Sequence, residues 1–363
     1  MEIRSIGRTG LSTPVVAFGG IPVNRVSEEQ GVATVRRCLE LGYRLFDTSR
    51  TYGDSERRVG LGLAGRCAAC GRHAQVIIAT KLGPWKVQSE QDAERFVHES
   101  LSALGAERVN IFMIKNLDNE DNLQRALTLA LPAVKRAQAA GLIDHIGMTS
   151  HVPRFAEAAL RTGEFSVAML PYSIANRSHE TVLDMCRQQA IGALAMKPLA
   201  GGALVAPGEP RKRGPNRREL TAVRDALRFC LSHPAVSAAV VGVGSPHEAE
   251  TAWHAGETAA PLRPDERDEL IAAAESLGED YCRGCDYCQP CSAEIEIGSI
   301  LQMADRVRRF DTDVALRDAT RARYRALAAT ADACQECREC LPRCPFSLSI
   351  PDLLRKAHDL LTG

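Results

Sequence analysis

The chain has 363 residues, of which 45% are hydrophobic and 5% are aromatic. Lys and Arg together number 45, and so do Asp and Glu, so the formal net charge is zero. A chain of this length can bury a large core, and its neutrality leaves no overall field to draw nucleic acid or an acidic lipid surface to it.

The opening residues MEIRSIGRTG lack the apolar core of a secretion signal, and the sequence has no apolar run long enough to span a membrane, which takes about 18 residues. The 13 cysteines occur without such a signal, which argues against a disulfide scaffold. These features predict a cytoplasmic protein whose thiols stay reduced, with neither nucleic acid nor membrane as a partner.

Short apolar runs alternate with longer amphipathic segments through most of the chain. Unbroken apolar runs are typical of strands that are buried on both faces. The expected strands cover residues 15–18, 44–47, 76–81, 109–115, 143–150, 167–171, 191–197 and 238–244. The expected helices cover 27–41, 56–64, 89–104, 123–140, 153–162, 179–189, 219–233 and 246–255, with Ser89 as the N-cap of the third.

Eight strand–helix units in series predict an α/β fold, a (β/α)8 TIM barrel over residues 1–263, with its chemistry at the carboxyl ends of the strands. A doubly wound open sheet is the alternative, but no G-x-G-x-x-G follows the first strand. The strand ends place Asp47, Lys81 and Lys115 at one mouth, and Tyr52 lies in the loop after the second strand.

Two runs of cysteines follow the expected barrel. They are Cys282, Cys285, Cys288 and Cys291, then Cys334, Cys337, Cys340 and Cys344. The second run has the C-x2-C-x2-C-x3-C-P spacing of bacterial ferredoxins, and CSAEIEIGSIL after the first run parallels CPFSLSIPDLL after the second. Zinc knots are the alternative, because C-x2-C pairs also bind zinc. The unbroken series that ends in Cys-Pro favours two [4Fe–4S] clusters, in which the last cysteine of each run commonly binds the other cluster.

This duplication predicts a second domain. We expect a small, mostly helical, dicluster ferredoxin-like domain over residues 280–363, ending in a C-terminal helix. A connecting helix or linker over residues 264–279 joins it to the barrel.

Five segments of the expected barrel stand out, namely FDTSRTYGDSE (46–56), ATKLG (79–83), ESLSALGAERVNIFMIK (99–115), IGMTS (146–150) and MKPLAGG (196–202). In content and in order, these segments resemble the aldo-keto reductases. With the cysteine region behind them, the whole chain resembles the subgroup of this family that carries a C-terminal ferredoxin-type domain. The resemblance implies hydride transfer between a nicotinamide and a carbonyl or alcohol.

The resemblance also implies catalytic roles for residues at the mouth. Tyr52 matches the proton donor, Lys81 the neighbouring lysine and Asp47 the aspartate that pairs with it. A tyrosine has a pKa near 10, and a cation within about 4–6 Å lowers it by ~1–3 units. We therefore expect Lys81 to make Tyr52 more acidic.

Lys115 departs from the family pattern, which usually has a histidine at this position. Two lysines and Asp47 give the pocket a net charge of about +1, which favours an oxyanion or an anionic substrate. The same lysine would also suit a lost ketone reductase activity, or a base or Schiff-base former in a lyase or isomerase.

The expected cofactor site follows from the same resemblance. Thr149 and Ser150 match the pair that holds the nicotinamide amide, Met196 the residue under the ring, and Ser166 the glutamine of the sixth strand. The other expected cofactor residues are Lys197, Gly242, Gly244, Ser245 and Glu248. A carboxylate at position 248 repels a 2′-phosphate, so NAD(H) is expected in preference to NADP(H).

Three functions are consistent with these motifs. The first is an oxidoreductase that couples hydride chemistry on a small carbonyl or alcohol substrate to iron–sulfur electron transfer, with a soluble electron carrier as partner. The second is a regulatory or sensor module that binds a nicotinamide and iron–sulfur clusters but has a degraded reductase site. The third is a non-redox lyase or isomerase that uses Lys115.

Overall fold

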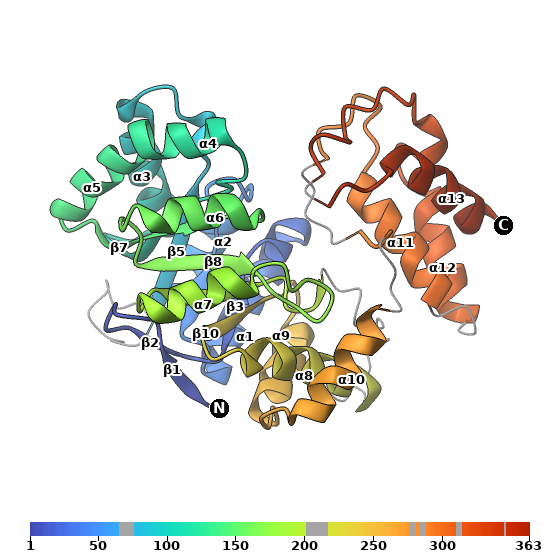
Figure 1. The fold of residues 1–363 in the computed structure, drawn as a ribbon, viewed down its shortest axis with the longest axis horizontal. Coiled ribbons are helices and arrows are strands. Elements are labelled where there is room, and N and C mark those ends of the chain that lie inside the picture. The colour runs from blue at the N-terminus through green and yellow to red at the C-terminus, as the bar shows by residue number, and fades with distance from the viewer. Residues whose placement is uncertain (65–75, 201–216, 276–279, 283–287, 310–313, 345) are drawn as a thin grey trace. The chain divides into compact units, whose positions relative to one another are not determined.

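The structure is a computed structural model that describes residues 1–363 apart from 65–75, 201–216, 276–279, 283–287, 310–313 and 345 (Figure 1). The chain divides into two compact units, one formed by Met1–Pro198 and Pro210–Leu262, the other by Leu199–Glu209 and Arg263–Gly363. In the second unit, the buried Tyr281 hydroxyl donates to the carbonyl of Ala200 at 2.9 Å, which ties Ala200 to the C-terminal region.

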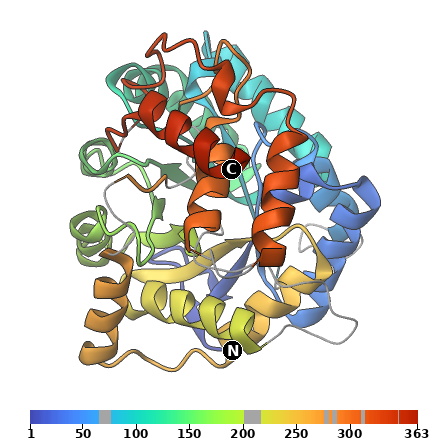
Figure 2. The ribbon, with the colours of Figure 1, turned by 90° about the vertical axis from the view of Figure 1, so that its right-hand side faces the viewer.

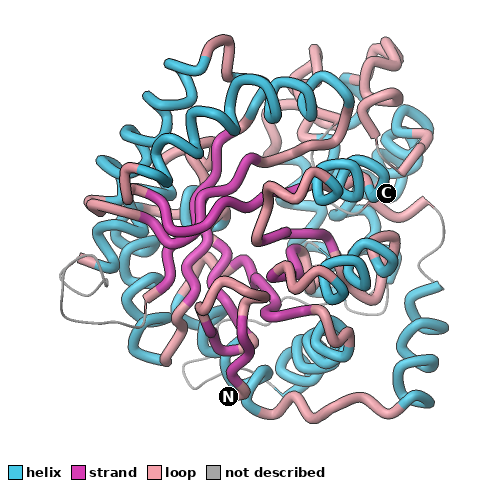
Figure 3. The backbone as a smooth tube through the Cα atoms, turned by 60° about the vertical axis from the view of Figure 1, so that its left-hand side comes forward, coloured by secondary structure: helices cyan, strands magenta, loops and turns pink. Residues whose placement is uncertain are grey.

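The first unit confirms the predicted barrel. Its eight parallel strands form a closed cylinder in which the last strand pairs with the first, and Figure 3 shows the strands gathered inside a layer of helices. The strands are β3 (Val16–Gly19), β4 (Leu45–Asp47), β5 (Ile77–Leu82), β6 (Val109–Ile114), β7 (Ile143–Thr149), β8 (Val167–Pro171), β9 (Gly192–Met196) and β10 (Val236–Gly242).

The outer helices are α1 (Glu28–Leu41), α2 (Ser55–Leu63), α3 (Glu90–Leu104), α4 (Glu120–Arg125), α5 (Leu131–Ala139), α6 (Pro153–Arg161), α7 (Glu180–Gln188), α8 (Arg217–Ser232) and α9 (Pro246–Glu257). Ser89 caps α3 as expected, because its hydroxyl accepts from the amide of Asp92 at 3.2 Å while the Asp92 carboxylate accepts from the Ser89 amide at 3.1 Å.

One predicted helix, 123–140, is interrupted. A π-helical turn over Ala126–Ala130 separates α4 from α5, and Pro132 lies in the first turn of α5. Proline has no amide hydrogen and its ring crowds the carbonyl four residues before it, here that of Thr128, so the helix widens at this point.

An N-terminal hairpin of two short strands, β1 (Ile3–Ser5) and β2 (Ser12–Pro14), closes the amino end of the barrel. Ile6 and Leu11 reach into the cluster of side chains that fills the interior. The turn at Gly7 has φ +51°, and a Cβ there would lie 2.3 Å from the amide nitrogen of Gly192 at the start of β9. Only glycine fits this approach.

The described part of the second unit is mostly helical. It contains α10 (Pro264–Glu275), α11 (Ile297–Arg309), α12 (Val314–Arg325), the 3-10 turn η6 (Ala331–Ala333) and α13 (Ile350–Thr362). The last three α-helices pack against one another (Figure 2). Helix α10 lies within the segment expected to connect the two domains, and residues 276–279 lie outside the described residues.

The sequence repeat recurs in this unit. Helix α11 begins six residues after Cys291, and α13 begins six residues after Cys344. Ile297 and Ile350 are equivalent in the repeat, and both lie buried in one apolar cluster. The two halves of the repeat therefore share a core. No helix of the described residues is long and apolar enough to cross a membrane.

Candidate active site and cysteine cluster

Three charged side chains form the top layer of the barrel interior. Side chains of a strand alternate between the two faces, so a residue two positions after an interior residue also faces inward. Asp47, Lys81 and Lys115 each follow by two a residue of the interior apolar cluster, namely Leu45, Ala79 and Met113. The strand pattern thus brings the three charges together above an apolar floor.

Asp47 and Lys81 form a buried ion pair. The Lys81 Nζ donates to a carboxylate oxygen of Asp47 and, at 2.7 Å, to the carbonyl of Thr48. The Asp47 side chain is 5% exposed and the Lys81 side chain is 1% exposed. Burial raises the pKa of Asp47 and lowers that of Lys81, and the attraction between the two charges opposes both shifts. These contacts hold the ammonium in one position.

Tyr52 lies against both lysines. Its ring centroid is 5.3 Å from the Nζ of Lys81 and 4.5 Å from the Nζ of Lys115. A turn fixes its backbone, since the Tyr52 amide donates to the carbonyl of Ser49 at 2.9 Å. Burial raises the pKa of the phenol, and the Asp47 carboxylate raises it further. This differs from the expected acidification, because desolvation of the phenolate and the charge of Asp47 both act in the opposite direction.

Lys115 points into the mouth and is buried. Its Nζ donates to the Thr51 hydroxyl at 2.9 Å and lies 5.8 Å from the ring of Trp85. Burial lowers the pKa of Lys115 to about 7, and the neighbouring charge of Lys81 contributes to this shift. Thr51 could not be predicted as its partner, because a threonine in a loop has no distinctive sequence pattern.

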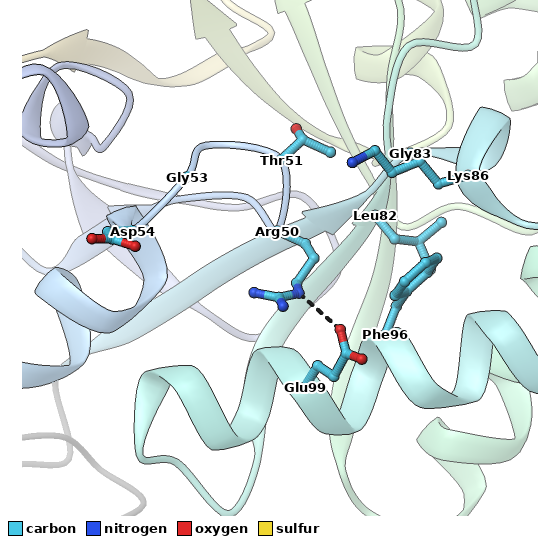
Figure 4. A pocket seen from close by; sticks show the side chains of 9 residues that line it. All are labelled: Arg50, Thr51, Gly53, Asp54, Leu82, Gly83, Lys86, Phe96 and Glu99. Carbon is cyan, nitrogen blue, oxygen red and sulfur yellow. Dashed lines mark hydrogen bonds and ion pairs between the residues drawn. The ribbon is translucent and has the colours of Figure 1, made fainter.

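A cavity of about 400 Å³ adjoins the loop 50–54 that carries Tyr52. Arg50 lies in its wall and donates to Glu99 of α3 at 3.1 Å (Figure 4) and to the buried Glu56 at 3.3 Å. These two ion pairs attach the loop to helices α2 and α3. The lining residues are Arg50, Thr51, Gly53, Asp54, Leu82, Gly83, Lys86, Phe96 and Glu99.

The two residues expected to hold the nicotinamide amide lie at the end of β7. The Thr149 hydroxyl accepts from the amide of Asn116 at 3.0 Å, and the Ser150 hydroxyl donates to the carbonyl of Leu117 at 2.7 Å. Ser150 also lies 3.0 Å from the carboxylate of Asp118. Both hydroxyls therefore brace the loop that follows Lys115. Asp118 was not among the predicted site residues, although it follows a strand end.

Three other residues that were expected to bind the cofactor lie at opposite ends of the barrel. Met196 ends β9 and packs against the interior cluster, and Lys197 after it has a left-handed backbone with φ +58°. Ser166 precedes β8, and its amide donates to the carbonyl of Ile146 at 2.9 Å. It lies at the amino end of the strand, away from Pro171 and the mouth, so the structure does not bring Ser166 to the site.

The residues after β10 form the start of α9. The Ser245 hydroxyl accepts from the amide of Glu248 at 3.2 Å, and the Glu248 carboxylate accepts from the amide of Gly244 at 2.7 Å. Gln30 holds the Gly244 carbonyl at 3.0 Å, and Gly242 ends the strand. A carboxylate thus occupies the helix N-terminus, where an anion would otherwise bind.

Cysteine residues from both runs line one hollow of the second unit. Its cysteines are Cys288, Cys291, Cys334, Cys337 and Cys340. Burial raises the pKa of the Cys340 thiol, and the nearby thiols of Cys334, Cys337 and Cys291 raise it further. Cys285 lies outside the described residues, and within the described ones no three Cys, His, Asp or Glu side chains form a metal-binding group.

The loop between these cysteines is strained. Glu336 and Arg338 flank Cys337 and have left-handed backbones, with φ of 51° and 61°. A non-glycine residue in this conformation costs roughly 1–2 kcal/mol. Such strain commonly marks a loop that is shaped for a ligand.

The fold and the mouth define a (β/α)8-barrel protein with a charged site at the carboxyl ends of its strands. The model of the Aldo/keto reductase family matches residues 15–275. The chain belongs to this family and is an oxidoreductase; NAD(P)H is the cofactor of the family. The match ends before the eight cysteines.

Known relatives agree with this assignment. L-galactose dehydrogenase from Arabidopsis thaliana is 29% identical over 247 residues, which cover 64% of this chain and 76% of the relative. D-threo-aldose 1-dehydrogenase from a Pseudomonas species is 25% identical over 241 residues, with coverages of 56% and 71%. The holo structure of the aldo-keto reductase AKR11C1 from Bacillus halodurans has a similar fold, with a TM-score of 0.62 and 22% identity over 76% of this chain and 96% of that one.

Proposed function

We propose that the barrel catalyses nicotinamide-dependent interconversion of an alcohol and a carbonyl on a small polar substrate, and that Tyr52, Lys81, Asp47 and Lys115 carry the reaction. The observation that carries this proposal is the contact of the Tyr52 ring with two lysines, one of which is fixed by a buried carboxylate. The names of the two dehydrogenase relatives support a polyhydroxy substrate for this chain as well.

The residues of the mouth would act on the substrate oxygen. A carbonyl that is reduced develops negative charge on its oxygen, and preorganised donors stabilise that charge without reorganising. The Tyr52 hydroxyl supplies one donor, and the ammonium of Lys81 supplies a positive field that Asp47 and the Thr48 carbonyl hold in place. The bound nicotinamide supplies or accepts the hydride.

The residues after β10 fit NAD(H) better than NADP(H). The carboxylate of Glu248 accepts from the Gly244 amide at 2.7 Å and so places a negative charge at the start of α9. A 2′-phosphate that approached this position would be repelled, whereas a 2′-hydroxyl would not. Thr149, Ser150, Met196 and Lys197 complete the proposed cofactor site.

The barrel proposal is tested by NADH oxidation and NAD⁺ reduction at 340 nm with a panel of aldoses, lactones and aldehydes. The variant Tyr52→Phe lacks the hydroxyl that donates the hydrogen bond. Its kcat should be lower by ~10²-fold or more, while its Kd for NADH should change less than about twofold. The matched control is Tyr43→Phe, which removes a buried hydroxyl bonded to the Ala249 carbonyl at 2.9 Å, outside the mouth. Equal activity in all three proteins would refute the role of Tyr52.

We also propose that residues 280–363 form a ferredoxin-like domain with two [4Fe–4S] clusters, joined to the barrel by residues 264–279. Cys288 and Cys291 share a hollow with Cys334, Cys337 and Cys340, so the last cysteine of the first run lies beside the second run. This supports a crossed arrangement in which the last cysteine of one run serves the other cluster. By the repeat, the other four ligands would be Cys282, Cys285, Cys288 and Cys344. Iron would offset the repulsion among closely placed thiolates.

The clusters, when bound, supply one-electron transfer, and two of them can together take the two electrons of a hydride. We propose that electrons pass between the barrel and these clusters and onward to a soluble carrier. Protein prepared without oxygen should contain about eight iron and eight acid-labile sulfide per chain. NAD⁺ with a hydroxyl substrate should bleach the cluster absorbance near 400 nm. Zinc without sulfide would refute the clusters, and turnover without bleaching would refute the electron transfer.

A further inference from the structure

We propose that the amine of Lys115 is the group that exchanges a proton with the substrate oxygen, and that Tyr52 remains a neutral phenol throughout. In alcohol oxidation Lys115 accepts the hydroxyl proton, and in carbonyl reduction it returns that proton. This inference rests on the proposed hydride chemistry of the barrel and reassigns the acid–base step, for which the family pattern points to tyrosine.

The geometry places the amine of Lys115 against the Tyr52 ring at the barrel mouth. Both lysines face the Tyr52 ring, but the Nζ of Lys115 is the nearer, at 4.5 Å from the centroid against 5.3 Å for Lys81. Lys81 already donates to Asp47 and to the Thr48 carbonyl. Among the described residues, the Lys115 side chain makes one hydrogen bond, to the Thr51 hydroxyl at 2.9 Å. Its other hydrogens can therefore reach a substrate.

Thr51 suits a lysine that changes its charge. A hydroxyl both donates and accepts, so it can accept from the ammonium and donate to the lone pair of the neutral amine. The Thr51 hydroxyl also lies 3.1 Å from the hydroxyl of Ser49, which keeps it in place. Lys115 is thus held in one position in both protonation states, as an acid–base group must be.

The surrounding charges favour a proton exchange near neutral pH. Burial has the largest effect on Lys115 and lowers its pKa, and Lys81 on β5 and Lys197 after β9 lower it further. Asp47 on β4 and Asp118 after β6 oppose the shift, and the result is a pKa of about 7. Two more groups face this region and carry no charge at pH 7. They are His151 after β7, whose pKa burial lowers to about 4, and Tyr52, whose pKa burial raises.

The proposed step is balanced. In the oxidative direction the carbon–hydrogen bond of the alcohol breaks and its electron pair leaves as hydride to the oxidised nicotinamide. The oxygen–hydrogen bond breaks and its proton moves to the Nζ of Lys115, which becomes an ammonium, and the carbon–oxygen double bond forms. A base whose pKa lies near the working pH can take this proton and later release it.

The first test needs neither cofactor nor activity. In apo protein labelled with ¹³C at lysine Cε, one resonance should titrate with a midpoint near pH 7, and it should be missing from the spectrum of Lys115→Arg. Removing the neighbouring cation in Lys81→Met should move that midpoint upward by ~1 unit. A spectrum in which every lysine titrates above pH 9 would overturn the proposal.

The second test uses turnover. The kcat for alcohol oxidation should rise through a midpoint near pH 7 in the wild type. Lys115→Arg, which stays charged, should lose that rise and ~10²-fold in kcat while still binding NADH. Lys115→His should restore part of the rate with a midpoint near 6.5. Tyr52→Phe should keep the midpoint near 7 at a lower rate.

The two proposals fail in different ways. If the lysine titrates near 7 but no nicotinamide turnover is found with any substrate, the hydride chemistry is refuted and the acid–base assignment falls with it. If turnover is present but the pH midpoint disappears in Tyr52→Phe and survives in Lys115→Arg, the oxidoreductase proposal stands and Tyr52 is the acid–base residue.

Discussion

Replacing Asp47 with asparagine should destabilise the barrel. The variant leaves the Lys81 ammonium, 1% exposed, with the Thr48 carbonyl but without its carboxylate. Breaking a buried ion pair by removing one partner costs about 3–5 kcal/mol. For a unit of this size 1 kcal/mol corresponds to about 2–4 °C in Tm, so a loss of 3 kcal/mol lowers Tm by roughly 6–12 °C.

The loss of stability in Asp47→Asn should become smaller as the pH rises. Burial lowers the pKa of Lys81, and without Asp47 nothing on β4 opposes that shift. The unfolded lysine binds a proton up to about pH 10.4, whereas the folded variant releases it at a lower pH. Stability rises with pH wherever the unfolded state binds more protons, so Asp47→Asn should recover stability between neutral pH and about 10.

The assay is thermal unfolding followed by circular dichroism at pH 6, 8 and 9.5. Asp144→Asn is the matched control, because it breaks a pair whose Arg108 is 52% exposed and should cost less than ~1 kcal/mol. The double variant Asp47→Asn/Lys81→Met should regain much of the loss, since it buries no unpaired charge. A single variant within about 1 kcal/mol of the wild type at pH 6, or a double variant no more stable than the single, would refute this reasoning.

Three further perturbations have defined outcomes. Glu248→Lys should improve the ratio of kcat/KM for NADP(H) over NAD(H) by ~10-fold, because it exchanges repulsion of the 2′-phosphate for attraction; an unchanged ratio would place the discrimination elsewhere. Cys340→Ser should lower bound iron by about half, whereas Cys230→Ser, in the barrel, should leave iron unchanged. Gly7→Ala should cost more than Gly10→Ala, about 2 against 1 kcal/mol by chemical unfolding, because at Gly7 the added carbon also meets the backbone of β9; equal costs would remove the steric argument.

Much of the barrel could be predicted because its strands are apolar on both faces. The run 167–171 matches β8 as observed, and the other strands differ by one or two residues at their ends. The N-terminal hairpin was missed, since IRS and STP are too short to show alternation. The π turn before Pro132 was also missed, although a proline inside a helical pattern is a warning of such a break.

Features of the site that depend on the positions of the strand ends could be predicted from the sequence. Features that depend on burial were harder to predict. Asp47 and Lys81 were expected to pair, and they do. The raised pKa of Tyr52 was not foreseen, because desolvation depends on packing that no motif shows. Ser166 was assigned from a family match without regard to its place before β8, so the position of the strand end should have excluded it from the mouth.

The hairpin that closes the amino end has a kinetic consequence. Ile6 and Leu11 fill that end of the interior, so a molecule that reaches Tyr52 must arrive and depart on the carboxyl side. The dinucleotide and the substrate would then both enter the site at the carboxyl ends of the strands. Whichever of the two binds second would block the dissociation of the first. Steady-state kinetics should therefore show a compulsory order of addition and release.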